Sequence, residues 1–513
     1  MEHDFKPAFS GAFANHFVKE TSMRRALKQL AALGCVSGLT FLLGGCALGP
    51  DYVRPAGAIP AAYLPPPEVA NTRSRVGMDK ADEQQTLIEG KAIPAQWWEL
   101  FHSQPLNDLI DASLRNNPSV DAAQAALRGA LAGVAAQQGA FYPTVDAAFA
   151  PTRQKVAGTL ASPSSSNASY YNLHTAQLSV SYVPDLFGGN QRQLESLTAQ
   201  AESQRLQNEA TYLTLTSNVV NAAIQEASLR GQISASKEII ASQTSLLAIL
   251  QRQFELGQVA TLDVAMQEAA LAATEATLPP LEKQLAVQTN VLTMLAGRYP
   301  AQGVDATFNI DDLALPATMP LTLPSRLIEQ RPDVRAAEEQ LHAASAQIGV
   351  AIANRLPSVT LGVNAYGSAA SALSDLFKSG TGFWTLAASI TQPLFDGGML
   401  KQRQAVAQAA YDAAAAQYRS ALINAFQNVA DALQAIEFDA RALRTAGKAQ
   451  QAAKKSLTIA RRQLALGDIS ALALLSSEQA YQQATLSLIA AQANRLSDTV
   501  ALFQALGGGW WNK

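Results

Sequence analysis

Residues 331–357 read RPDVRAAEEQLHAASAQIGVAIANRLP, a segment bounded by Pro332 and Pro357 with no proline between them. The chain contains a second segment of this kind, from Pro118 to Pro143, and both pairs of prolines are 25 residues apart. Proline is favoured in the first turn of a helix and disrupts a helix interior. Each segment is therefore predicted to form one helix of about 24 residues.

Other landmarks recur in the same order along the chain. They are Asp185-Leu186-Phe187-Gly188-Gly189 with Leu394-Phe395-Asp396-Gly397-Gly398, Gly257 with Gly467, and Gly297 with Gly507. The offset is about 210 residues, which is too long for the unit of a solenoid. The 513-residue chain is therefore predicted to be an internal twofold repeat that builds one body.

Two long stretches of the chain contain no proline and only one glycine each, Gly231 and Gly447. The first covers 67 residues from Asn190 to Leu256 and the second covers 68 residues from Met399 to Leu466. At about 1.5 Å of rise per residue, each would form a helix about 100 Å long. The second stretch has a coiled-coil spacing of apolar residues: Leu422, Phe426, Val429, Leu433, Ile436, Ala440 and Leu443. Each repeat also has about 40 residues between its two glycines, expected to form one more helix.

Four short segments alternate apolar with other residues, as β-strands do. They contain Val145, Ala147 and Phe149; Leu178, Val180 and Tyr182; Val359, Leu361, Val363 and Ala365; and Trp384, Leu386, Ala388 and Ile390. Each is close to the length of about ten residues that crosses a bilayer as a tilted strand. Two membrane-crossing hairpins, at 144–184 and 358–393, are therefore predicted. Two ordinary soluble hairpins are the alternative.

Four strands cannot close a barrel, and an open sheet edge in lipid would leave backbone groups without hydrogen bonds. Two chains would supply about eight strands, whose side chains fill the interior, whereas three chains would supply about twelve and leave a lumen. We therefore predict an α+β membrane protein: a homotrimer with a 12-strand outer-membrane β-barrel, four strands per chain, continuous with a long periplasmic α-helical coiled-coil barrel. A solid helical rod without a lumen is the alternative for the helices.

The N-terminal region has the pattern of a bacterial lipoprotein signal. Arg24, Arg25 and Lys28 precede an apolar stretch that ends in Leu43-Gly44-Gly45-Cys46. Residues 1–45 are predicted to be a signal peptide, with Met23 as the true start. Cys46 would then carry an N-acyl chain and an S-diacylglycerol. A short transmembrane anchor is the alternative, although the stretch is shorter than the roughly 20 apolar residues that a spanning helix needs.

Composition narrows the class of protein further. Net charge is −3 and only 15% of the residues are charged, so the chain has no basic field for nucleic acid. Ala47 follows the cysteine where an aspartate would favour retention at the inner membrane, so sorting to the outer membrane is expected.

Enzymatic chemistry has little support in the sequence. The five histidines are scattered, with no helix presenting a pair of them to a metal, and no phosphate-binding loop is present. Catalytic residues, metal ligands and cofactors other than the lipid are therefore not expected. The run Gly507-Gly508-Gly509 is expected to fray before Trp510 and Trp511.

Three longer motifs carry a resemblance to a known family. They are residues 49–55 (GPDYVRP), residues 97–101 (WWELF) and residues 323–338 (LPSRLIEQRPDVRAAE). From Cys46 to about Leu506 the chain resembles the TolC-like outer membrane efflux channels of the NodT lipoprotein branch. This resemblance implies a homotrimeric exit duct in outer membrane lipid, docked through a periplasmic adaptor (membrane fusion) protein to an inner-membrane transporter of the RND type.

The resemblance also suggests where such a duct would close. Gly257 and Gly467 mark the helical turns at the adaptor-facing tips. Asp263 falls at an aspartate position of the family gate and Leu472 at a constricting leucine position. Ser476 stands where related channels often carry aspartate, so a charged lock is in doubt here. An ordinary interhelical contact is the alternative role for each gate residue.

The expected division of the chain follows from these features. It comprises a signal peptide (1–45), an acylated strap (46–104), a first repeat (105–300), a linker (301–324), a second repeat (325–507) and a tail (508–513). Two other functions share parts of this pattern: the outlet duct of a type I protein secretion system, and a structural coiled-coil lipoprotein that spans the envelope.

Overall fold

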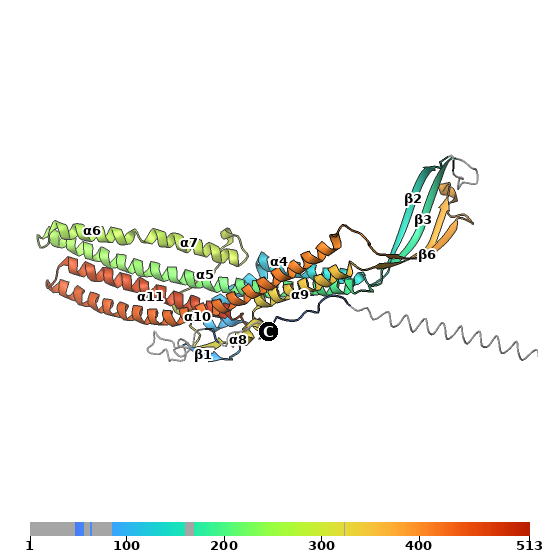
Figure 1. Ribbon diagram of the computed structural model, residues 1–513. Helices are drawn as coiled ribbons and strands as arrows, with labels where there is room; N and C mark the ends of the chain where they lie inside the picture. Colours follow the sequence, from blue (N-terminus) through green and yellow to red (C-terminus); the bar gives the residue numbers. More distant parts are fainter. Residues whose placement is uncertain are drawn as a thin grey trace, which may run out of the picture. The chain divides into compact units, whose positions relative to one another are not determined.

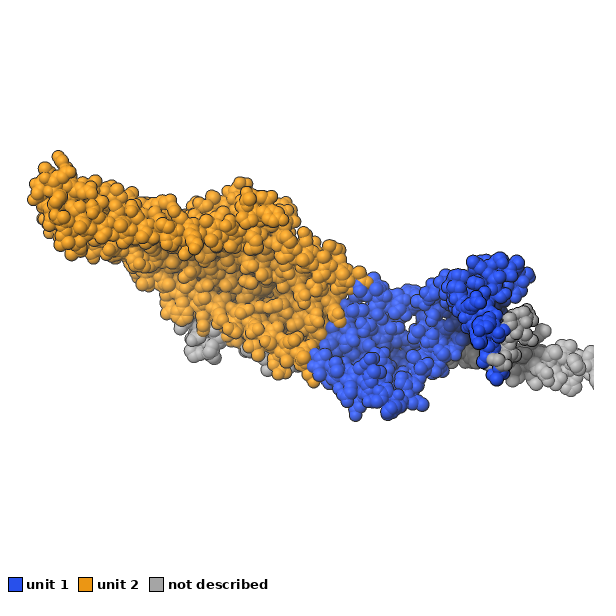
Figure 2. All heavy atoms as spheres, turned by 90° about the horizontal axis from the view of Figure 1, so that it is seen from above, with its two compact units in different colours: residues 1–52, 133–198, 343–411 blue, residues 53–132, 199–342, 412–513 orange. Residues whose placement is uncertain are grey.

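The computed structural model describes residues 47–55, 62–63, 85–157, 159, 169–322 and 324–512. The predicted signal peptide and Cys46 lie outside the described residues. By their contacts the described residues form two compact units, coloured separately in Figure 2. The first unit includes residues 133–198 and 343–411, and the second includes residues 53–132, 199–342 and 412–513.

The two proline-bounded helices are present. Helix α4 (Pro118–Gly139) and helix α9 (Pro332–Ala353) each have 22 residues. Each begins at its proline, where a missing backbone N–H costs nothing because the first N–H groups of a helix have no partner within it.

One four-stranded antiparallel sheet lies in the first unit, in the order β2-β3-β5-β6. Its strands are β2 (Thr144–Lys155), β3 (Tyr170–Tyr182), β5 (Ser358–Ala370) and β6 (Gly382–Thr391). Each repeat contributes one hairpin, and pairing of β3 with β5 joins the two, with Val180 opposite Val363. Among the described residues, β2 and β6 are therefore the edges of the sheet (Figure 1).

The two long helices are α5 (Gly189–Glu255, 67 residues) and α10 (Met399–Leu466, 68 residues). An aspartate before each helix caps its first turn: Asp185 Oδ2 accepts a hydrogen bond of 2.8 Å from the N–H of Gln191, and Asp396 Oδ2 accepts one of 2.8 Å from that of Leu400. The bonds from the N–H groups of Leu400 and Gly398 lower the pKa of Asp396 because they favour its charged form. On α10, five of the seven expected seam residues are buried, from Val429 to Leu443.

The segments that follow the long helices differ between the repeats. In the second repeat, α11 (Ala471–Ala505) is one helix of 35 residues. In the first repeat, the expected single helix is wrong: α6 (Thr261–Glu275) ends and α7 (Leu278–Leu295) begins a new helix. Pro279 and Pro280 explain the break, because neither can donate the N–H that a continuous helix needs at that position.

Several shorter elements complete the two units. Strand β1 (Thr86–Glu89) pairs in parallel with β4 (Thr318–Leu321), a pairing that the sequence analysis did not anticipate. The remaining elements are the short helices η1 (Trp97–Phe101), α3 (Gln104–Asn116), η2 (Pro300–Gln302), η3 (Ile310–Asp312) and α8 (Pro324–Gln330); η4 (Leu373–Asp375) belongs to the first unit and η5 (Trp510–Asn512) ends the chain.

The glycine run after α11 is not frayed, so that expectation is wrong. Gly507, Gly508 and Gly509 are buried and all have positive φ, at 95°, 69° and 74°. Trp97, which stacks on Phe503 with ring centroids 5.3 Å apart, forms part of the same core. The chain end is therefore packed into the second unit.

None of the helices in the described part of the chain is long and apolar enough to cross a membrane.

Candidate functional site

The two helical turns expected at Gly257 and Gly467 have the same geometry. Each glycine follows a long helix, with φ of 69° and 80°, in the left-handed region that suits glycine. Gly257 N–H donates to Phe254 O at 2.9 Å and the next residue bonds back across the turn, and Gly467 N–H donates likewise to Leu464 O at 3.0 Å. This is the Schellman motif, which satisfies the last carbonyls of a helix and reverses the chain.

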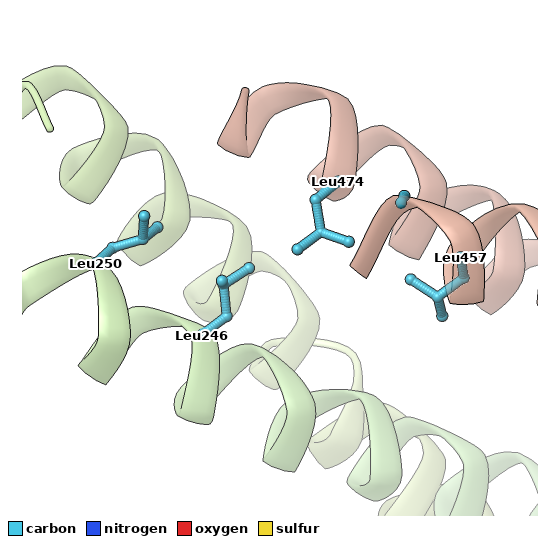
Figure 3. Packing of buried hydrophobic residues seen from close by; sticks show 5 residues of the cluster. Leu246, Leu250, Leu457 and Leu474 are labelled. Carbon is cyan, nitrogen blue, oxygen red and sulfur yellow. The ribbon is translucent and has the colours of Figure 1, made fainter. Parts of the chain in front are cut away.

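An apolar cluster lies beneath these turns, and we call it the tip cluster. It consists of Leu246 and Leu250 of α5, Leu457 and Ala460 of α10, and Leu474 of α11. Figure 3 shows the labelled leucines in the space between the helices of the two repeats. Val264 of α6 packs against the cluster as well. Full burial of one leucine stabilises a fold by roughly 1.5–3 kcal/mol, so the cluster holds the two hairpin tips of one chain together.

The three expected gate residues lie on the first two helical turns beyond the tips. Asp263 Oδ2 accepts a hydrogen bond from the N–H of Ala260 at 3.1 Å, so this carboxylate caps α6. Leu472 is 54% exposed, and Ser476 is exposed one turn further along α11. Among the described residues, no hydrogen bond joins these three side chains.

A charged network that sequence reasoning missed lies next to the gate positions. Glu478 of α11 is only 2% exposed, and its Oε1 accepts a hydrogen bond of 3.0 Å from Ser242 Oγ of α5. The same oxygen lies 3.3 Å from Arg461 Nη2 of α10, which also donates to Ser242. The sequence signal was available, because a glutamate four residues after the buried Leu474 falls on the apolar face of α11.

A second carboxylate contact joins α10 and α11 farther along the bundle. The side chains of Asp439 and Asp498 share a hydrogen bond. Burial, with the neighbouring Asp439 carboxyl, raises the pKa of Asp498 to about 7. Two carboxyl groups in contact cannot both be charged at little cost, so this pair holds a proton near neutral pH.

The segment that follows the expected lipidation site is held firmly within the first unit. Arg192 of α5 donates to the carbonyl of Leu48 at 3.2 Å and pairs with Asp51 at 2.7 Å. A Cβ on Gly349 of α9 would lie 2.7 Å from Leu48 O, and a Cβ on Gly188 would lie 2.4 Å from the Cα of residue 47. These glycines therefore allow the strap to approach the helices closely.

Within the part of the chain that the structure describes, no group of histidine, cysteine, aspartate and glutamate side chains is placed to hold a metal ion.

The chain belongs to the outer membrane efflux protein family, whose sequence profile matches residues 109–298 and 323–508. The two matched segments correspond to the two repeats. Family membership makes this chain an outer membrane efflux channel with a periplasmic part.

Curated relatives from Pseudomonas putida are similar over most of their length. The chain is 30% identical over 478 residues to a probable efflux pump outer membrane protein, TtgC, covering 92% of this chain and 94% of the relative. It is 30% identical over 429 residues to a pyoverdine export outer membrane protein, OpmQ, covering 83% and 90%.

Solved structures share the fold. The open-state outer membrane channel MtrE of Neisseria gonorrhoeae is 26% identical, with a TM-score of 0.75, covering 91% of this chain and 99% of that one. The outer membrane channel OprN is 25% identical, with a TM-score of 0.79, covering 91% and 100%. The architecture is thus the TolC-like one.

Proposed function

We propose that this chain is the outer membrane channel of a tripartite efflux system. It exports small molecules, including drugs and toxic compounds, which an inner-membrane RND-type transporter passes on through a periplasmic adaptor protein. Curated relatives named for the export of toluene, antibiotics and pyoverdine support this cargo class.

One structural observation carries the proposal: a sheet with two free edges in a chain that also contains two helices of 67 and 68 residues. Strands β2 and β6 each pair on one side only among the described residues. Their exposed side chains include large apolar ones, with Val145 63%, Leu386 70% and Ile390 74% exposed. An edge of this kind is stable in lipid only when another strand pairs with it.

Closure by three copies follows from the strand count. Three four-stranded sheets give about twelve strands, which leave a lumen, whereas about eight would be filled by their own side chains. The long helices of the three chains then continue the wall as a helical tube in the periplasm. The native assembly is therefore a homotrimer.

The free ends of this tube are the turns at Gly257 and Gly467, which face the adaptor. Leu472, which is 54% exposed in one chain, forms an apolar constriction when three copies meet around the axis. Asp263 and Ser476 line the same region. Closure is mainly apolar, because Leu472 is a large apolar side chain and Ser476 carries no charge.

Cys46 carries the lipid that attaches the chain to the outer membrane. The support from the structure is indirect: residues 48–51, just after it, are bound by Arg192, so an acyl chain at this point would be tied to a rigid part of the protein. Replacing Cys46 by serine should abolish the incorporation of labelled fatty acid, and persistent labelling would exclude this site.

The decisive test is conductance of the purified protein in planar bilayers. Leu472→Ser should increase the single-channel current, because a polar ring no longer excludes water. Leu262→Ser is the matched control, since Leu262 is 66% exposed on the first turn of α6 and is not assigned to the gate. An unchanged current in Leu472→Ser would remove this residue from the gate, and a monomeric native mass would refute the assembly.

Cargo is tested separately, in cells. Deleting the gene should increase the accumulation of several dyes and antibiotics, and the wild-type gene should restore efflux. Loss of a secreted polypeptide with unchanged dye accumulation would instead identify a protein secretion outlet. A defect in envelope integrity alone would identify a structural lipoprotein.

A further inference from the structure

The register of the four-stranded sheet assigns its residues to two faces of different chemistry. Residues opposite one another on neighbouring strands share a face, and successive residues of one strand alternate between faces. One row of paired residues is apolar: Val145, Val180, Val363 and Leu386. The adjacent row is polar: Asp146, Ser179, Asn364 and Thr385. We call the face that carries the first row the apolar face.

Two basic residues lie on the apolar face at the end of β2 that is far from α4. Strand β2 begins at Thr144, shortly after α4, and Lys155 is its last residue. Arg153 and Lys155 are an even number of residues from Val145, so they belong to the same face. Lys155 is opposite Tyr170, and its Nζ lies 5.3 Å from the centre of that ring, which confirms the shared face. Both basic side chains are exposed.

The positive charge at this end of the sheet is not balanced. The segment from Ala147 to Pro184 contains no aspartate or glutamate, although the whole chain carries a net charge of −3. The charged residues of the second hairpin are Asp375 and Lys378, which pair with each other at 2.5 Å. Among the described residues, neither Arg153 nor Lys155 has an acidic partner. Both side chains are therefore available to an anion from outside the chain.

The length of β2 places these charges at the level of lipid headgroups. Lys155 follows Val145 by ten residues, which is about 33 Å of extended strand and about 25 Å of height at the tilt of about 40° of a membrane-crossing strand. The apolar band of such proteins is also about 25 Å high. Tyr170 and Trp384, 56% and 76% exposed, lie near the hairpin ends of β3 and β6, as aromatic residues do at membrane interfaces.

We propose that Arg153 and Lys155 bind the phosphate groups of a phosphorylated glycolipid in the outer leaflet of the outer membrane. The inference rests on the proposed placement of the sheet in that membrane, where the hairpin ends face outward because the helices are periplasmic. A guanidinium group pairs with phosphate through two parallel hydrogen bonds, and the lysine adds a second positive charge. The acyl chains of the same lipid lie along the apolar face, so one molecule contacts both parts of this surface.

The test measures which lipids the purified full-length protein retains from nanodiscs of phosphatidylcholine that contain a minor fraction of lipid A. Native mass spectrometry should show phosphorylated lipid A retained in preference to phosphatidylcholine, less so as salt rises, and dephosphorylated lipid A not retained. Insertion without any preference for lipid A would overturn this inference alone, whereas failure to insert would also overturn the membrane placement of the sheet. Complete competition by inorganic phosphate would show recognition of a free anion and overturn the lipid assignment.

Variants locate the binding on β2. Arg153→Gln and Lys155→Gln should each weaken the retention of lipid A about fivefold, as expected for one basic residue near an anionic lipid surface, and together more than about tenfold. Lys454→Gln with Lys455→Gln is the matched control, because it removes the same charge from exposed positions on α10. Arg153→Lys with Lys155→Arg keeps both charges and should keep most of the binding. Equal retention by wild type and the double glutamine variant of β2 would refute the proposal.

Discussion

Replacing Leu250 by alanine tests whether the tip cluster holds the two hairpins of one chain together. Leu250 is 1% exposed, and its neighbours in the cluster come from α10 and α11 as well as from α5. Leucine-to-alanine changes at such sites cost about 2.7–5.0 kcal/mol, depending on how far the surroundings can collapse. We expect about 3 kcal/mol here, toward the lower end of that range, because the partly buried side chains that surround the cluster can move inward to some extent.

Hydrogen–deuterium exchange measures this loss of stability in the segments around the tip cluster. A loss of about 3 kcal/mol in local stability should accelerate amide exchange about 100-fold in peptides covering residues 246–260 and 457–475, since each 1.4 kcal/mol is about tenfold. Leu262→Ala is the matched control: the same atoms are removed at a side chain that is 66% exposed, so exchange should change less than about twofold. Acceleration below about threefold in Leu250→Ala, or equal effects in the two variants, would refute the reasoning.

Three further changes test other contacts. The pKa of Asp498 is raised from 3.8 to about 7, so between these two values the folded protein keeps a proton that the unfolded chain has released. The stability of the fold should therefore fall as the pH rises from about 4 to about 7 and then level off. Asp498→Asn should flatten this pH profile, as measured by thermal melts. Gly508→Ala should destabilise the second unit by roughly 1–3 kcal/mol or more, the cost of a strained backbone, and should make the tail sensitive to protease. Gly447→Ala is the control, because Gly447 is at an open position on α10, and it should have neither effect. Glu478→Gln can keep the hydrogen bond from Ser242 but loses the charge that faces Arg461. Amide hydrogen exchange at the start of α11 should therefore accelerate about tenfold. An unchanged exchange rate would mean that the charge of Glu478 is not needed.

Most element bounds could be predicted because their signals are local. Proline marks the start of α4 and α9 through its own missing N–H, and glycine marks the ends of α5 and α10 through its own left-handed φ. The break between α6 and α7 has an equally local signal in Pro279 and Pro280, although the twofold repeat predicted one continuous helix there. A duplicated origin therefore did not ensure a duplicated helix.

The candidate site could likewise be predicted only where its sequence signals are local. The turns at Gly257 and Gly467 lie where the glycine spacing predicted them, whereas the roles of Asp263, Leu472 and Ser476 stay predictions. The partners of Glu478 could not be predicted, because Ser242 is 236 residues away and Arg461 belongs to a different helix. Local sequence patterns do not predict which faces of two helices pack together.

The sequence by itself determined the repeat, the lengths of the long helices and the alternation of the strands, because backbone geometry and side-chain periodicity act over a few residues. Only the tertiary structure decided how β3 joins β5, which residues enter the tip cluster, and why the glycine run at the chain end must be glycine. Those properties depend on atoms that are distant in the chain: Gly508 is required because Leu213 occupies the space that a side chain would need. Close packing sets such requirements only after the elements have been brought together.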